Sequence, residues 1–314
     1  MKIIALLPVK NEAWILNSYL SSVSTIADEI IVLDDSSTDN SKSLLEATGV
    51  TVISYDPKDE KVVDMSARRQ QLLEAGRKAG GTHFIWLDAD ETFSSNFILE
   101  ARKIISALKP GQKINMRWVH LWKDVNHYLD DSHSPFGNVW KDFIVCDNPQ
   151  NNFTQAFISE ARTPGSHLDS TKLPEETGVV LHWQFSRWEI TQYKQSLYRC
   201  IELLEGSRSA KRINNTYRIT LDNSKLKKNK IPKAWMEGIP LPTINKASDI
   251  NWYNKQIQTL FIKHGIRHFE PLQIWHLPSL RKQFVETVHR EPKPELFPNW
   301  LVTLNDIKNK LRYG

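Results

Sequence analysis

The sequence predicts an α/β fold: a Rossmann-like mixed, mainly parallel sheet flanked by helices, with a helical C-terminal extension. In the first 110 residues, short apolar runs alternate with longer amphipathic segments, which is the pattern of strands joined by helices that pack on the faces of a sheet. From Ile250 onward the chain is helical in pieces, and prolines interrupt it. A chain of 314 residues is long enough to build a substantial core around these elements.

The expected elements follow these runs in chain order. Strands are expected at 3–7, 29–33, 50–54, 83–87 and 114–119. Helices are expected at 13–22, 40–47, 64–79 and 96–108. Four residues before the second helix can cap its exposed amides: Ser36, Ser37, Thr38 and Asp39.

The pattern changes between residues 123 and 172, where scattered aromatic and polar residues and prolines replace the periodic runs. Such a stretch is typical of loops and short strands over a binding face, not of a second core. A strand at 179–183 and an amphipathic helix at 187–204 follow. We therefore divide the chain into residues 1–205, with a distinct region from about residue 115, and a mainly helical extension at 206–314.

Composition limits the compartment in which the chain works. The cysteines are Cys146 and Cys200, far apart in the sequence, so no disulfide framework is expected and a reducing compartment fits best. Every apolar run is too short for a signal peptide or a membrane span. We expect a cytoplasmic protein whose membrane contact, if it has one, is peripheral and at the inner membrane.

Much of the positive charge is concentrated in one basic run, from Arg208 to Lys233, which contains a single acid, Asp222. A run of this kind indicates either a solvated charged face or an anionic partner. A diphosphate, an acidic membrane surface and a nucleic acid would each fit. The run alone does not choose among them.

The most informative segment reads FIWLDADE, an apolar strand followed by Asp88, Ala89, Asp90 and Glu91. Ligands of open α/β sheets bind at the carboxyl ends of strands, and residues two apart in an extended chain point the same way. Asp88 and Asp90 could therefore share one Mg²⁺ or Mn²⁺ ion, whose other ligands would be phosphate oxygens and water. Capping turns also produce such triplets, and we expect Glu91 to cap the helix that follows.

A second strand also ends in acids, in the segment EIIVLDDSSTDNS. Carboxylates at such a position can accept hydrogen bonds from a base imide or from ribose hydroxyls. We assign Asp35, and with it Asp34, to nucleoside binding. The alternative is that these acids, like Asp39, only cap the next helix.

The first strand leads into a turn in LLPVKNEAWIL, which contains Pro8, Asn11 and Glu12. Three apolar strands thus lead, in this order, into Pro8 to Glu12, into Asp34 to Asp39, and into Asp88 to Glu91. This order and spacing over roughly the first hundred residues resembles the nucleotide-binding half of family 2 glycosyltransferases, which have the glycosyltransferase A fold.

The resemblance implies roles for several residues. Pro8 and the neighbouring backbone, with Glu12, would bind substrate, and Asp35 would contact the base. Asp90 would ligate the metal, with Asp88 near the ribose or the metal. Relatives carry Ala-Arg-Asn before the acidic triplet, whereas this chain has Ala67, Arg68 and Arg69. Arg68 would therefore contact the base or a phosphate, or else be a solvated helix arginine.

A later segment, LHWQFSRWEITQYKQSLYR, is similar to a pattern of histidine, aromatic, lysine and tyrosine in bacterial members of the family that build surface glycans. By this similarity His182 would be a third metal ligand or touch the diphosphate, unless it is a core histidine. Lys194 would share one helix face with Arg187, and both could balance the charge of the leaving group. An exposed polar face explains these two residues equally well.

An inverting transfer needs one carboxylate to take the proton of the acceptor hydroxyl. Relatives place an acid well before the late histidine, and Glu160 in FISEARTPG is our candidate for this catalytic base. Asp142, Asp147 and Asp169 are the alternatives. The histidine that precedes this acid in some relatives is Ser159 here.

Together these features predict a metal-dependent, inverting hexosyltransferase of surface polysaccharide biosynthesis, with residues 1–205 as its catalytic domain and Mn²⁺ or Mg²⁺ as its cofactor. The donor would be a nucleotide sugar, with UDP-hexose favoured, and the acceptor a glycan or a lipid-linked hydroxyl. A nucleotidyltransferase is less well supported, because no glycine-rich loop follows the first strand. A protein that binds nucleic acid or glycan without catalysis is the third reading, although no nucleic acid is expected in the acidic cleft.

Overall fold

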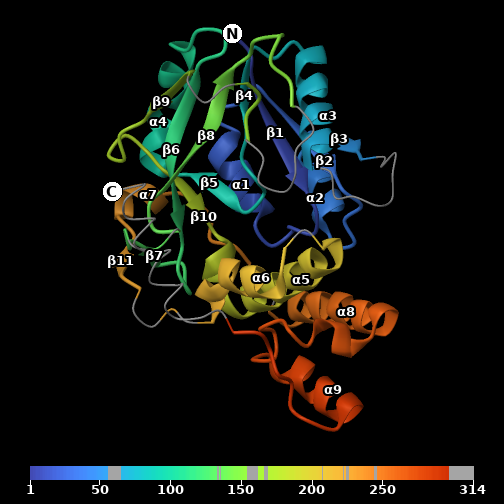
Figure 1. Cartoon of the computed structure of the whole chain (residues 1–314). Coiled ribbons are helices and arrows are strands. Elements are labelled where there is room, and N and C mark those ends of the chain that lie inside the picture. The colour runs from blue at the N-terminus through green and yellow to red at the C-terminus, as the bar shows by residue number, and fades with distance from the viewer. Residues whose placement is uncertain are drawn as a thin grey trace.

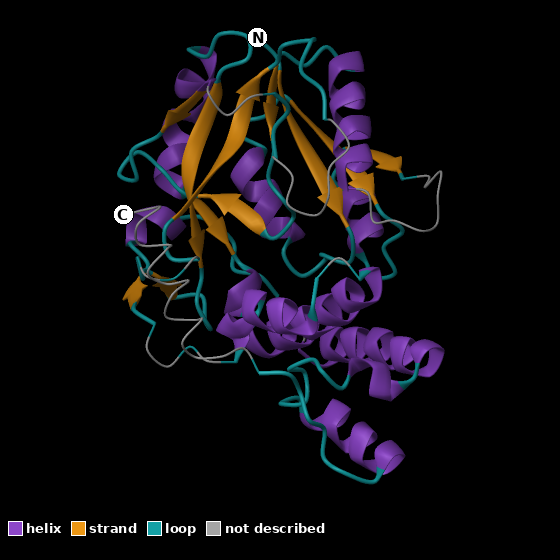
Figure 2. Ribbon diagram, in the orientation of Figure 1, coloured by secondary structure: helices purple, strands orange, loops and turns teal. Residues whose placement is uncertain are grey.

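The computed structural model describes residues 1–55, 65–132, 134, 136–153, 162–165, 169–206, 208–221, 223, 226–243 and 246–296. A large sheet forms the upper part of the molecule in Figure 1, and a layer of helices lies beneath it. Within the described ranges the sheet has nine strands, and a separate pair of short strands, β7 (His127–Leu129) and β11 (Lys228–Lys230), lies beside it (Figure 2).

The large sheet is built around β1 (Ile3–Val9). On one side of β1 lie β2 (Glu29–Asp34) and β3 (Thr51–Ser54), and on the other lie β4 (His83–Ile85), β8 (Val139–Cys146), β6 (Lys113–His120), β10 (Val180–His182) and β5 (Glu91–Phe93). A ninth strand, β9 (Ser170–Lys172), pairs with β6. Parallel pairs join β1 to β2 and β4, β2 to β3, and β6 to β9 and β10, whereas β8 and β5 run antiparallel to their partners. The predicted fold class, a mixed and mainly parallel sheet with flanking helices, is confirmed.

Helices cover both faces of this sheet. On one face, α1 (Leu16–Val23), α2 (Ser41–Ala47) and α4 (Ser95–Ser106) pack against Ile3, Ala5 and Leu7 of β1. On the other face, α3 (Met65–Lys78) packs against Ile4 and Leu6. Successive residues of β1 therefore enter opposite cores, which explains why this strand is an unbroken apolar run instead of an alternating one.

The segment 123–172 differs from its prediction in one respect. It contributes β8, which lies between β4 and β6 in the sheet and buries Phe143, Ile144 and Val145 in its cores. The strand was missed because its first half, Val139 to Asp142, mixes aromatic and charged residues that lie near the edge of the core. A short strand, β7 (His127–Leu129), also comes from this segment and pairs with β11 (Lys228–Lys230).

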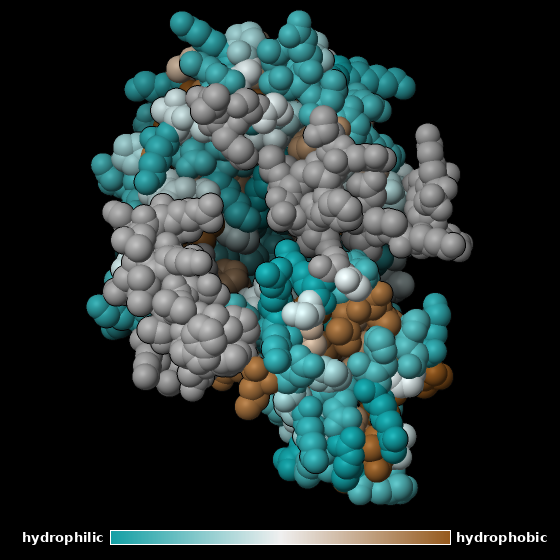
Figure 3. Space-filling view, in the orientation of Figure 1, coloured by the Kyte–Doolittle hydropathy of each residue, from teal (hydrophilic) through white to brown (hydrophobic). Residues whose placement is uncertain are grey.

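The C-terminal half is helical: α5 (Trp188–Glu205), α6 (Ala210–Thr216), α7 (Lys233–Met236), α8 (Lys246–His264) and α9 (Pro278–Val288). A second core, which includes Leu197, Ile257, Phe261 and Phe284, joins α5, α8 and α9. In Figure 3 this helical layer carries the larger brown areas on an otherwise mostly hydrophilic face. Among the described helices, none is both long enough and apolar enough to cross a bilayer. The boundary at residue 205 stays a prediction.

Candidate functional site

The loops after β1 and β2 meet because the two strands run parallel, with Val9 opposite Asp34. Asn11, in the left-handed conformation with φ 58°, accepts the amide of Thr38 at 2.7 Å, and its own amide donates to the Ser37 hydroxyl at 3.0 Å. The amide of Glu12 donates to the Ser41 hydroxyl at 2.9 Å. These bonds hold the two loops as one rigid rim at the carboxyl ends of the strands.

The structure brings two predicted nucleoside-binding residues together beside this rim. Arg68 of α3 pairs with Asp35 at 3.0 Å, and its guanidinium lies 4.7 Å from the centre of the Tyr55 ring. Lys10 also pairs with Asp35, at 3.1 Å. Asp34 is buried and accepts the amide of Ser37 at 3.3 Å, whereas Pro8, in β1, is partly exposed. Asp35, Arg68 and Tyr55 thus form a charged and aromatic corner.

A cavity of about 220 Å³ opens between this rim and the helical layer. Its walls come from three parts of the chain: the loops after the strands, the start of α5 and the start of α8. The lining residues are Asn11, Glu12, Trp14, Thr38, Asp39, Asp90, Gln184, Arg187, Ile190, Thr191, Lys194, Asp249, Trp252 and Tyr253. The helical extension therefore closes a site whose other wall belongs to the sheet.

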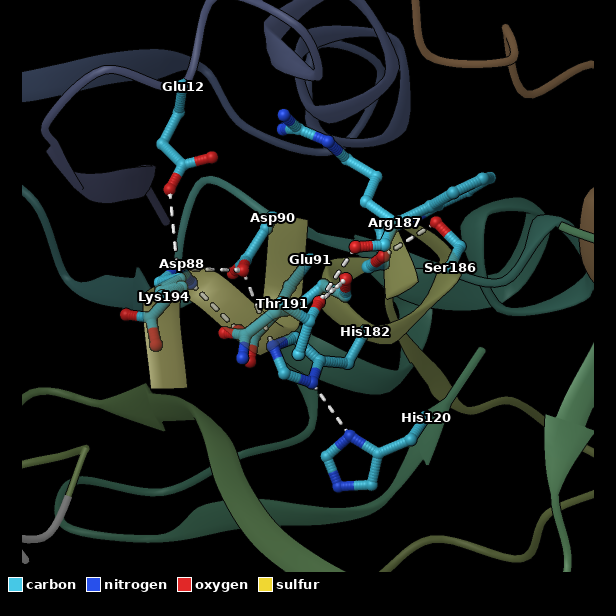
Figure 4. Close-up of polar contacts among 12 residues, drawn as sticks. Glu12, Asp88, Asp90, Glu91, His120, His182, Ser186, Arg187, Thr191 and Lys194 are labelled. Atoms are coloured by element: carbon cyan, nitrogen blue, oxygen red, sulfur yellow. Dashed lines mark hydrogen bonds and ion pairs between the residues drawn. The ribbon is translucent and has the colours of Figure 1, made fainter. Parts of the chain in front are cut away.

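Asp90 is the acid of the triplet that reaches this cavity (Figure 4). Its carboxylate lies 3.5 Å from Nε2 of His182 and 3.9 Å from Nζ of Lys194. Burial alone would raise the pKa of Asp90, but His182 and Lys194 outweigh it and hold the pKa well below its usual range. Asp90 is therefore a buried carboxylate that stays ionised.

Glu12 shares Lys194 with Asp90, at 3.7 Å from the ammonium. Burial raises the pKa of Glu12 to about 7; Lys194 opposes this shift, and the charge of Asp90 adds to it. The indole nitrogen of Trp14 donates to Glu12 at 2.6 Å. Burial alone would lower the pKa of Lys194, but the surrounding tyrosines and carboxylates raise it well above its ordinary value. The lysine is thus a permanent cation between two acids.

Asp88 lies in different surroundings. Its carboxylate pairs with Arg162 at 2.9 Å, and the same guanidinium holds Glu91 through two bonds of 2.5 and 2.6 Å. The expectation that Glu91 caps the next helix is wrong: Glu91 lies in β5 and accepts the amide of Asp88, while Ser94 precedes α4. Arg162 was not foreseen, because an arginine in a weakly patterned segment gives no signal of a buried partner.

His182 makes a second contact, behind Asp90. Its Nδ1 lies 2.7 Å from Nδ1 of His120, and both rings are buried. The pKa of His120 lies well below its ordinary value, mainly because the ring is buried and secondly because a charge on His182 would repel a second one. His120 is therefore neutral. Sequence reasoning missed His120, although both β6 and β10 end in a histidine.

Arg187 forms part of the cavity wall between Trp14 and α8. It pairs with Asp249 of α8, and its guanidinium lies 4.0 Å from the centre of the Trp14 ring. Lys194 and Arg187 both line the cavity. They pair with different acids, because Arg187 binds Asp249 whereas Lys194 lies beside Glu12 and Asp90. Asp249, Trp252 and Tyr253 of α8 were not foreseen as site residues.

The candidate bases are spread apart. Glu160 lies outside the described residues. Asp142 is buried and accepts a hydrogen bond from the side-chain Nδ2 of Asn115 at 2.7 Å, Asp147 is held by Arg77, and Asp169 is exposed. None of these three lines the cavity described above. The identity of the base stays a prediction.

The predicted metal ligands come together in part. Asp90 and His182 offer an ionised carboxylate and an imidazole nitrogen side by side, a donor pair that suits Mn²⁺. Asp88 is engaged by Arg162, and no cluster of three ligating side chains occurs in the described part of the chain. The pair fits an ion that takes its remaining ligands from phosphates and water.

Comparison with known proteins places the first part of this chain. Residues 5–111 match the model of the family described as glycosyl transferase family 2. Among curated proteins, none matches the sequence at a significant level.

Several solved structures are similar over part of the chain. A mycobacterial protein is 22% identical, with a TM-score of 0.32 over 38% of this chain and 41% of that one. TarS of S. aureus is 20% identical, with a TM-score of 0.29 over 40% of this chain and 22% of that one. Glucosyl-3-phosphoglycerate synthase from Mycobacterium tuberculosis, in complex with Mn²⁺ and UDP-glucose, is 23% identical, with a TM-score of 0.28 over 38% of this chain and 43% of that one. This chain thus spans less than half the length of each of these proteins.

The match over residues 5–111 contains all three motifs, which follow β1, β2 and β4. The mixed sheet flanked by helices is consistent with the glycosyltransferase A fold. Residues 5–111 therefore match the model described as glycosyl transferase family 2, in agreement with the predicted enzyme class, and the activity of the whole chain is a proposal.

Proposed function

We propose that this protein transfers a sugar from a nucleotide-sugar donor, with UDP-hexose favoured, to a hydroxyl of a glycan or lipid-linked acceptor, with inversion and with the help of Mn²⁺ or Mg²⁺. The observation that carries the proposal is the state of Asp90. It is an ionised, buried carboxylate in the turn between β4 and β5, it lines the cavity, and His182 and Lys194 lie beside it. This is the arrangement that a metal-bound diphosphate requires.

The distribution of charged and aromatic side chains supports a position for the donor. The corner of Asp35, Arg68 and Tyr55 supports binding of the nucleoside, because it offers acceptors, donors and a ring face. The diphosphate then reaches the cavity edge, where Lys194 balances the charge that develops on the leaving group. A divalent ion held by Asp90 and His182 would polarise the same phosphates as a Lewis acid.

The size and lining of the cavity support our assignment of the donor sugar to it. A cavity of about 220 Å³ has room for one sugar ring. Gln184 and Thr191 offer hydrogen-bonding groups for its hydroxyls, and Trp252 offers an apolar wall. We therefore assign donor-sugar selection to α5 and α8 together.

Glu160 remains our proposed base, since an inverting transfer needs a carboxylate on the acceptor side. Glu160→Gln should lower kcat by at least about 10²-fold while leaving UDP affinity unchanged. Unchanged kcat in this variant would exclude Glu160 as the base. Asp142→Asn and Asp169→Asn are the matched controls for the alternatives.

We further propose a cytoplasmic enzyme that contacts the membrane peripherally when the acceptor is lipid-linked. The support is the charge of β11 and its surroundings, where Lys227, Lys228, Lys230 and Lys233 are all exposed. Activity on an acceptor in anionic vesicles should then fall with added salt more than activity on a soluble acceptor. Equal salt dependence on the two acceptors would remove this part of the proposal.

The reaction itself is tested with a panel of donors. Thermal unfolding is followed with UDP-, GDP-, dTDP- and CMP-linked sugars, with and without Mn²⁺, and release of nucleoside diphosphate is then measured for the donor that stabilises the protein most. Asp90→Asn should abolish the metal-dependent stabilisation and the release, whereas Glu46→Gln, at an exposed carboxylate of α2, should change neither. Donor binding and turnover that ignore both the ion and Asp90 would refute the proposed function.

A further inference from the structure

His120 has no part in the proposed reaction, yet it lies directly behind a residue that does. β6 and β10 pair in parallel, and their register places His182 opposite His120. Side chains of opposite residues on neighbouring strands project from the same face of the sheet. The two rings therefore meet edge to edge, with 2.7 Å between their Nδ1 atoms (Figure 4).

One hydrogen atom lies between these two nitrogens, and its position decides what His182 can do. His182 must be neutral for a cation to bind beside Asp90. If His120 then donates the hydrogen, His182 carries its own hydrogen on Nε2, facing the Asp90 carboxylate 3.5 Å away. If His182 donates it, Nε2 of His182 is left with a free lone pair on the side of Asp90. Only the second arrangement lets His182 bind a cation.

We propose that His120 is a positioning residue that accepts the Nδ1 hydrogen of His182 and so directs the Nε2 lone pair of His182 to the divalent ion beside Asp90. This inference rests on the proposed metal dependence. Histidine ligands of metals usually donate their second ring N–H to a carboxylate or a carbonyl, and here a neutral imidazole takes that place.

The surroundings of His120 fit this role. Its Nε2 is buried and has no hydrogen-bond partner among the described residues. The ring makes edge contacts with Phe136 and Phe185, with centroids 5.6 and 5.2 Å away. When His182 donates, the hydrogen of His120 moves to this Nε2. His120 can therefore serve either arrangement without a further polar partner.

Three variants test the inference by Mn²⁺ binding in the presence of UDP, read from the free-Mn²⁺ signal in electron paramagnetic resonance. His120→Leu removes the acceptor and should weaken Mn²⁺ binding about 10- to 100-fold. His120→Asn places a carbonyl oxygen near the position of Nδ1 and should restore most of the affinity. Phe136→Leu, which changes the aromatic surroundings but not the hydrogen bond, should bind like the wild type.

Equal Mn²⁺ affinity in all three variants would overturn the role of His120 while leaving metal dependence intact. A wild-type protein that binds no Mn²⁺ would overturn both this inference and the proposed cofactor. If His120→Leu does not fold, pulsed electron paramagnetic resonance of wild-type protein with Mn²⁺ and UDP decides the matter. A ¹⁴N coupling from a bound imidazole is expected, and its absence would show that His120 has no ligand to position.

Discussion

The two acids of the Asp88–Ala89–Asp90 triplet belong to two regions that differ in how tightly their carboxylates are paired. The region of Asp88 is a network closed around the fully buried Glu91: Arg162 binds both acids, while the Asp88 side chain itself stays 35% exposed. The region of Asp90 is open to the cavity, and its contacts with His182 and Lys194 are 3.5 and 3.9 Å long. One residue of separation thus changes an acid from a tightly paired group to a loosely paired one.

The difference shows what each region can do. Short bidentate bonds between an arginine and a carboxylate fix geometry and are costly to break. Longer contacts around an ionised carboxylate leave room for a ligand to enter between the charges. We interpret the Arg162 region as the support that shapes the end of β4, and the Asp90 region as the part that exchanges ligands.

The first prediction removes the support. Arg162→Met leaves Glu91 buried without its partner, and we expect the free energy of unfolding to fall by about 3–5 kcal/mol. Urea denaturation measures this. Arg281→Met, which breaks a bidentate pair with Glu291 on the surface, is the matched control and should leave the urea midpoint almost unchanged. Similar losses in both variants would mean that the Arg162 network does not differ from a surface pair.

The second prediction disturbs the open region. Lys194→Met removes the cation beside Asp90 and Glu12, and we expect kcat to fall by about 10²- to 10³-fold because charge on the leaving diphosphate is no longer balanced. Steady-state kinetics with the preferred donor measure the loss. Lys255→Met, at an exposed position on α8, should leave kcat unchanged. A normal kcat in Lys194→Met would show that Lys194 only stabilises the structure and does not contribute to the reaction.

The third prediction concerns pH. The pKa of Glu12, about 7, lies above the ordinary value of 4.5 because the group is buried. Between pH 4.5 and 7, Glu12 therefore keeps its proton in the native state but loses it in the unfolded state. The free energy of unfolding that this proton contributes is fully present below pH 4.5 and is lost as pH rises through 7. Comparison of unfolding free energies from pH 5 to 8 should show a decline in the wild type that Glu12→Gln reduces. Parallel pH profiles would contradict the raised pKa.

The closed and open regions also differ in how far sequence could predict them. The strand ends at Asp35 and Asp90 follow from local apolar runs, and β1, β2 and β4 begin at the predicted residues. The position of a strand and the acids that follow it are local properties of the sequence, so both can be predicted before the fold is known. The ion pair between Asp35 and Arg68 was not foreseen, although the sequence made both residues candidates for the same pocket.

The remaining parts depend on contacts between distant segments. Arg162 and Asp249 find their acidic or basic partners across more than sixty positions of the chain, and nothing in their local sequence marks them. β8 is a strand because β4 and β6 bury its second half, not because its own pattern alternates. His120 could have been noticed, since WVH and VLH both end apolar strands in histidine, but their pairing required the sheet order.

The last and smallest effect is expected at the nucleoside corner, which neither region of the triplet touches. Asp35→Asn weakens acceptance of hydrogen bonds from the base, and we expect UDP affinity to fall about tenfold, since a hydrogen bond to a charged group contributes about 1.5–3 kcal/mol and the amide retains part of it. Calorimetric titration with UDP measures it. Glu29→Gln, at the opposite end of the same strand, is the control. If Asp35→Asn lowers UDP affinity while kcat at saturating donor stays normal, Asp35 contributes to donor binding and not to the chemical step near Asp90. A loss of kcat in this variant would show that Asp35 also affects the chemical step.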